Sequence, residues 1–194
     1  MTAFTTTQVD GLTTTQVIGL TTTQIALFNT GLFATLTTTQ LTGLTTTQVA
    51  SLSAAQAGAL STTQFNALTA TQNGAVLGAS QLSAFSTTAI TNIGSTSITT
   101  LTTAQVNALS SVQIAGLTTT QIATMTGTQM GFINFAAAIG LSTTEVAAIT
   151  TTQTASLTGT VLQGIAAAGN ISSLTTTAFS QLTSTLIGAM SPYF

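Results

Sequence analysis

The stretch Leu12-Thr13-Thr14-Thr15-Gln16-Val17-Ile18-Gly19 decides the fold, because close copies of it fill the chain. An apolar residue leads each eight-residue unit, or octad, and this leading residue is taken as position zero. The series of leading residues starts at Phe4 and runs to Met190, with one-residue insertions before Leu77 and Ala166 that we expect to produce only slight kinks. This gives about 24 octads without a linker, which predicts one repeat domain over residues 1–194.

Positions one and four of the octad carry the signals of a helix start. Position one is Ser or Thr in 19 octads, Asn in two and Gly in two, and these residues are favoured at helix N-caps. Position four is Gln in 14 octads and Glu once, at Glu145. Ser or Thr followed three residues later by Gln or Glu forms a capping box, and apolar residues at positions zero and five suit the hydrophobic staple. The octad therefore predicts a short capped helix and a bend near position seven, which is usually Gly or Ala.

Such helices need neighbours, since isolated helices shorter than roughly 12 residues are marginal in water. We therefore expect an all-α solenoid in which successive octads stack and bury their apolar residues against each other. The alternative is a β-solenoid with two octads in each coil of about 16 residues, because Thr and Val are good strand residues. Asn and Gly at position one weigh against strands, where both residues are depleted.

The composition excludes most kinds of chemistry. The chain has 194 residues and only two ionisable side chains, Asp10 and Glu145, and it lacks Lys, Arg, His, Cys and Trp. Without cations we expect no nucleic-acid partner, and without His, Cys or an acidic loop we expect no zinc, haem or calcium site. A catalytic triad cannot be built either. The sequence thus predicts no catalytic, cofactor-binding or metal-binding residue, and a protein that is not an enzyme.

The chain is apolar on average, with a mean hydropathy of +0.57, but we expect no membrane span. Its longest strongly apolar stretch is Met130–Leu141, well short of the roughly 20 residues that a spanning helix needs. Residues 1–5 also lack the basic region and apolar core of a secretory signal peptide. Export would then bypass a cleaved N-terminal signal, with the C-terminal tail as a candidate address.

A net charge of −2 gives little repulsion between copies, so we expect the chain to associate with itself, head to tail and also laterally. Two bulky octads and the two ends of the chain supply the candidate residues. The bulky octads are either thicker layers of the core or exposed patches. The candidate self-association residues are Phe4, Leu27, Phe28, Leu32, Phe33, Met130, Phe132, Ile133, Phe135, Met190, Tyr193 and Phe194.

The Leu-Thr-Thr-Thr-Gln-Val array resembles the Thr/Gln-rich tandem repeats of large bacterial secreted or surface adhesin-like proteins. This resemblance covers nearly the whole chain and implies an extracellular or cell-surface location, without assigning a role to any residue. The helix starts also resemble those of TAL-effector repeats, although the period differs and the basic residues are missing.

The expected function is that of a structural repeat protein that self-assembles into an extracellular filament or surface layer. The alternative is a surface-binding module, either an ice-binding protein or an adhesin stalk. Ice binding would use the Thr runs, because regularly spaced hydroxyl and methyl groups on a flat face can order water. The competing interpretation of these threonines is that they are helix caps and solvated first-turn residues.

Overall fold

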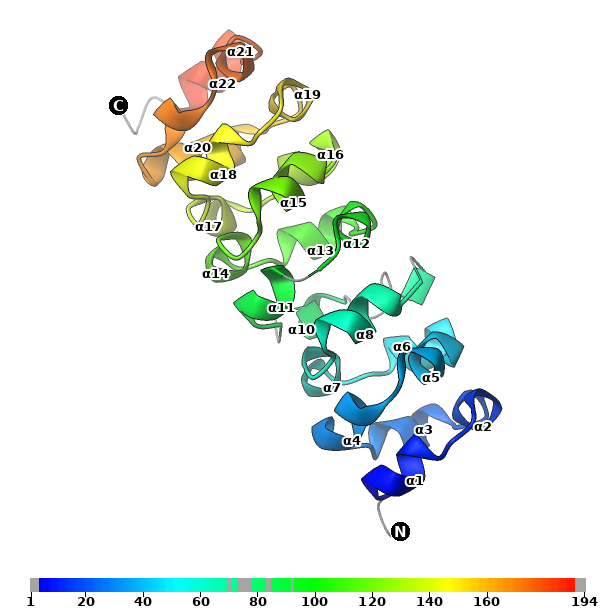
Figure 1. Cartoon of the computed structure of the whole chain (residues 1–194). Coiled ribbons are helices and arrows are strands. Elements are labelled where there is room, and N and C mark those ends of the chain that lie inside the picture. The colour runs from blue at the N-terminus through cyan, green and yellow to red at the C-terminus, as the bar shows by residue number, and fades with distance from the viewer. Residues whose placement is uncertain (1–3, 70, 73–77, 83–84, 92, 191–194) are drawn as a thin grey trace. The chain divides into compact units, whose positions relative to one another are not determined.

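A computed structural model describes residues 4–69, 71–72, 78–82, 85–91 and 93–190 of the protein. The chain divides into two compact units, residues 1–93 and 94–194, and each is a stack of short helices (Figure 1). No β-strand occurs in the described ranges. The predicted all-α solenoid is therefore confirmed, and the β-solenoid alternative is wrong.

The helices of residues 1–93 each occupy one octad. They have four to six residues. Their bounds are α1 Thr6–Asp10, α2 Thr14–Ile18, α3 Thr22–Ala26, α4 Thr30–Thr35, α5 Thr38–Gly43, α6 Thr46–Ala50, α7 Ala54–Gly58, α8 Thr62–Ala67, α10 Ala79–Leu82 and α11 Thr87–Thr91.

Residues 94–194 continue the same pattern, with one longer helix and one 3₁₀ turn. The bounds are α12 Ser95–Thr99, α13 Thr103–Asn107, α14 Ser111–Ile114, α15 Thr119–Thr124, α16 Gly127–Gly131, α17 Phe135–Ala138, α18 Thr143–Ala147, α19 Thr151–Thr154, α20 Gly159–Ala167, η1 Ile171–Ser173, α21 Thr176–Phe179 and α22 Ser184–Ala189.

The capping box starts most of these helices, as the sequence predicts. Before α5, for example, the Gln40 N–H donates to Thr37 Oγ1 at 3.2 Å and the Thr37 N–H donates to Gln40 Oε1 at 2.8 Å. This exchange satisfies two of the N–H groups that a helix start leaves without a partner. The N-cap residues with both bonds are Thr5, Thr13, Thr21, Thr37, Thr45, Ser53, Ser61, Thr69, Thr102, Ser110, Thr118, Thr126, Ser142 and Thr150.

Helices three octads apart in the chain pack on one another within each unit. In residues 1–93, α1 contacts α4 and α2 contacts α5, while in residues 94–194 α12 contacts α15 and α16 contacts α19. Positions zero and five fill the space between these layers and are buried almost throughout, as at Leu36 and Leu41. One turn of the solenoid thus contains about three octads, and the side-chain bonds described below join groups 28 residues apart.

Small residues allow successive turns to approach closely. Gly140, at position seven, lies so near the Ser111 carbonyl of the preceding turn that an added Cβ would overlap it. Gly43 lies in the same way against the Thr14 side chain. Glycine is therefore needed at these two positions because the preceding turn passes close by, in addition to its place at the bend.

The insertion before Ala166 lengthens a helix instead of producing a slight kink. α20 runs for nine residues, through the place where the octad at Ala166 would otherwise start a new helix. The helix is followed by Gly169, which has a φ of +75°. The Asn170 N–H donates to the Ile165 carbonyl and the Gly169 N–H donates to the Ala166 carbonyl. This is a Schellman motif, which requires a left-handed residue after the helix. The insertion before Leu77 lies outside the described residues.

Candidate self-association surfaces

The glutamines at position four join each turn of the solenoid to the preceding one. The Gln40 Nε2 donates to the Leu12 carbonyl at 2.8 Å and to the Val9 carbonyl at 3.0 Å, 28 and 31 residues earlier. Its Oε1 meanwhile accepts from the Thr37 N–H, so one buried amide caps its own helix and binds the neighbouring turn.

This double role recurs along both units. In each case Nε2 lies 2.7–2.8 Å from the leading carbonyl 28 residues earlier, which belongs to the octad three before. The buried glutamines that do this are Gln40, Gln48, Gln56, Gln64, Gln72, Gln129 and Gln153. The predicted capping role of these glutamines is confirmed, but it uses only the Oε1 of each side-chain amide.

Glu145 breaks this row with a carboxyl group. Its Oε2 accepts from the Ser142 N–H at 2.7 Å and from the Ser142 Oγ at 2.6 Å, so the capping box is intact. Its Oε1 is buried and has no hydrogen-bond partner, in a side chain that is only 4% exposed. By the register of the row this oxygen replaces the Nε2 that would donate to the Ile114 and Leu117 carbonyls. A hydrogen-bond acceptor thus stands where the fold uses a donor.

The turn formed by α1, α2 and α3 leaves one face of this arrangement open. Gln8 and Gln16 are exposed and Gln24 is half-buried. Each caps its own helix through Oε1, but no described residue accepts a hydrogen bond from its Nε2. The leading residue Phe4 is 37% exposed, whereas Phe28, its counterpart one turn later, is 3% exposed. We call Phe4, Gln8, Leu12, Gln16, Leu20 and Gln24 the amide face.

The turn formed by η1, α21 and α22 leaves the complementary face open. Phe179 and Ile187 occupy position five, which is buried elsewhere, yet both are 40% exposed. The leading carbonyls of Leu174 and Leu182 have no donor among the described residues. We call Ile171, Leu174, Phe179, Leu182 and Ile187 the carbonyl face.

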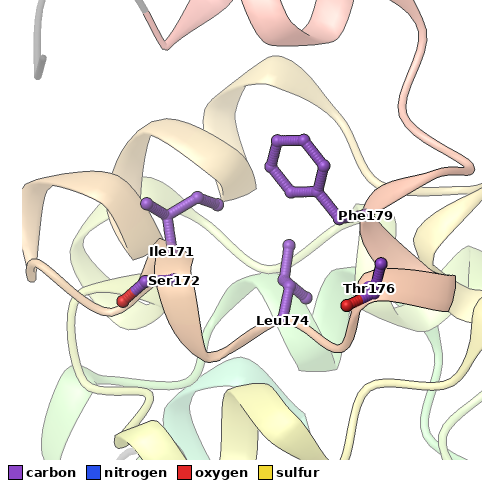
Figure 2. Close-up of a pocket in the computed structure, with 5 residues that line it drawn as sticks. All are labelled: Ile171, Ser172, Leu174, Thr176 and Phe179. Atoms are coloured by element: carbon purple, nitrogen blue, oxygen red, sulfur yellow. The ribbon is translucent and has the colours of Figure 1, made fainter.

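A shallow groove of about 300 Å³ crosses the carbonyl face. It is lined by Ile171, Ser172, Leu174, Thr176 and Phe179, and its exposed surface is mostly apolar. Figure 2 shows the Leu174 side chain at the centre of the groove, with Ile171 on one side and Phe179 on the other. The groove therefore presents the surface that a further turn of the solenoid would cover.

The structure divides the candidate self-association residues between core and surface. In the two bulky octads Leu27, Phe132 and Phe135 are exposed, and Phe132 lines a second groove of about 290 Å³ beside Asn107 and Asn134. Phe4 lies on the amide face and is also exposed. Tyr193 and Phe194 lie outside the described residues. The buried candidates are Phe28, Leu32, Phe33, Met130, Ile133 and Met190.

Sequence reasoning did not single out Gln8, Gln16, Phe179 or Ile187. Their octad positions are identical to those of buried residues, and exposure depends only on whether another turn covers them. The sequence shows that the exposed glutamines are eight residues apart. It does not show that such a glutamine can reach a carbonyl 28 residues earlier, because that contact depends on how the turns pack.

The described residues hold no group of three or more His, Cys, Asp or Glu side chains that could bind a metal ion. Among the helices described, none has both the length and the apolar character needed to cross a membrane.

Comparison with known families agrees with the repeat architecture. Residues 90–127 match the family model described as the ALTTAQ repeat. Within that segment, Leu101-Thr102-Thr103-Ala104-Gln105 has the leading residue, cap and position-four glutamine of the octad. No curated protein and no solved structure matches the chain. The chain thus contains a recognised tandem repeat, folded as a helical solenoid.

Proposed function

We propose that this protein is a non-enzymatic structural repeat protein that self-assembles into a filament or surface layer outside the cell. The observation that carries the proposal is the exposure of the amide face and the carbonyl face. Each presents one side of the turn-to-turn contact that recurs inside each unit. With only two ionisable groups in 194 residues, almost no charge repulsion opposes the approach of copies.

The polar side chains support a structural role. Among the described residues, most position-four glutamines and position-one hydroxyls form caps and turn-to-turn bonds, and no cluster suited to acid–base or nucleophilic chemistry is found there. Asp10 and Glu145, the two ionisable side chains, lie in different units.

Assembly is tested by measuring the size of the full chain over a range of concentrations. Sedimentation velocity should show species that grow with concentration, and negative-stain microscopy should show filaments or sheets. A chain that stays monomeric at every concentration would contradict the proposal. If that monomer also produced thermal hysteresis in ice-growth assays, the ice-binding alternative would replace it.

The extracellular location rests on the resemblance to the Thr/Gln-rich repeats of secreted and surface proteins. It is tested by antibody labelling of intact and permeabilised cells of the source organism. Labelling of intact cells is the expected result, and labelling that requires permeabilisation would place the assembly inside the cell.

A further inference from the structure

The two open faces carry matching sets of hydrogen-bonding groups. On the amide face, Gln8, Gln16 and Gln24 repeat every eight residues with no acceptor for Nε2 among the described residues. On the carbonyl face, the leading carbonyls of Leu174 and Leu182 are also eight residues apart and have no donor among the described residues. The Nε2 groups of Gln8 and Gln16 thus have the same spacing as these two carbonyls.

We propose that the amide face of one copy docks on the carbonyl face of a second copy, and that this junction repeats the turn-to-turn contact found inside each unit. This inference rests on the proposed self-assembly and specifies which surfaces meet. The partner is another molecule of this chain, since its own turns are the structures known to fit such a face.

The internal contacts fix the register of the junction. Inside a unit, each Nε2 reaches the leading carbonyl of the octad three before and, in most cases, the position-five carbonyl of the octad four before, as Gln40 does with Leu12 and Val9. The same rule pairs Gln8 with the carbonyls of Leu174 and Ile171 in the second copy. Gln16 then meets the Leu182 carbonyl. A shift by one octad would leave one glutamine without its carbonyl, so the full register is favoured.

The apolar groups of the two faces fit the same register. Leading aromatic residues three octads apart already pack edge to face at 5.4 Å between ring centroids, in the pair Phe4 and Phe28. A position-five ring and a leading ring three octads later do the same at 5.5 Å, in the pair Phe65 and Phe85. At the junction, Phe4 would be three octads after Phe179 and would enter the groove between it and Leu174 (Figure 2). Edge-to-face packing adds to the gain from burying both rings.

Each copy carries one amide face and one carbonyl face, and the two are different surfaces. A contact between different surfaces is heterologous, and it produces an open polymer when its rotation does not close a ring. The junction therefore predicts a polar filament, in which every subunit points in the same direction.

The first test replaces the donors without removing the helix caps. In the full chain, Gln8→Glu combined with Gln16→Glu keeps the capping box, as Glu145 does with Ser142, but places acceptors opposite carbonyls. We expect the concentration for half-assembly to rise by about tenfold or more, while the far-UV circular dichroism stays unchanged. Thr119→Glu combined with Thr143→Glu is the matched control, since it adds the same charge at exposed first-turn positions and should assemble normally.

The second test identifies which surfaces meet. The chain has no cysteine, so Phe4→Cys and Phe179→Cys each introduce a single thiol. When the two variants are mixed and oxidised, disulfide-linked dimers containing one copy of each should exceed the dimers that either variant forms alone. Equal crosslinking of each variant with itself, or none in the mixture, would overturn the proposed junction.

The outcomes separate this inference from the proposed function. If the unmodified chain forms no assembly, the proposed function fails and the junction fails with it. If the chain assembles but the double glutamate variant assembles equally well, the proposed function stands and the junction is wrong.

Discussion

At the scale of the residue, the structure depends on one side chain serving two turns. A glutamine amide has an acceptor and a donor, and here the acceptor completes a capping box while the donor crosses to the preceding turn. Buried amides of this kind stabilise the fold only because both ends are satisfied. A glutamate at this position supplies the acceptor but not the donor. Glu145 shows the result, because its Oε1 has no hydrogen-bond partner.

Glu145→Gln should therefore stabilise the folded chain. The new Nε2 would donate to the carbonyls that the row places 28 and 31 residues earlier, and it would remove a buried acceptor without a partner. Leaving such a group unsatisfied costs about 1–3 kcal/mol, so the free energy of unfolding in urea should rise by a similar amount.

The reciprocal substitution Gln153→Glu is the matched control. It removes donors that lie 2.7 Å from the Ile122 and Met125 carbonyls and should lower the free energy of unfolding. If Glu145→Gln instead lowered the stability, the assignment of Glu145 to this row would be wrong.

At the scale of the element, most of each helix was predictable from the octad alone. Thr118 and Gln121 predict a capping box, and both of its bonds are present. The end of α20 was not predicted, because the inserted residue was expected to produce only a kink. Gly169 and the following Asn170 were the available signal, since glycine is the usual residue after a helix that ends in a left-handed turn.

The close approach of turns gives a prediction about two glycines at position seven. Gly140→Ala would place a methyl group against the Ser111 backbone and should cost about 1–3 kcal/mol of unfolding free energy. Gly19→Ala is the control, because a Cβ there meets carbonyl oxygens no nearer than 3.4 Å. It should be neutral or stabilising by up to about 1 kcal/mol, through the lower entropy of the unfolded chain. Equal effects at both positions in thermal unfolding would contradict the packing described here.

At the scale of the whole molecule, the sequence predicted a stack of octads but could not give the number of octads in a turn. That number follows from the packing of helices three octads apart, such as α1 on α4, which depends on how the side chains of successive layers interlock. Exposure could not be predicted for the same reason. Phe179 and Phe33 share position five, yet Phe33 is fully buried and Phe179 is 40% exposed.

The near absence of charge gives a prediction for the assembly. Amide–carbonyl bonds and apolar contacts are not screened by salt, unlike interactions between exposed charges. Assembly followed by light scattering should therefore have the same midpoint concentration at low and at high sodium chloride. A midpoint that rises steeply with salt would indicate that ionic contacts join the copies. The chain has no Lys, Arg or His side chain to form such contacts, so this result would contradict the account.

Cryo-electron microscopy of the assembled full chain tests the central claim most directly. The account predicts a polar filament in which Gln8 and Gln16 of one subunit lie within hydrogen-bond distance of the Leu174 and Leu182 carbonyls of the next. The spacing of helices across that junction should equal the spacing between successive turns inside a unit. Subunits joined side by side, or through two copies of the same face, would contradict it.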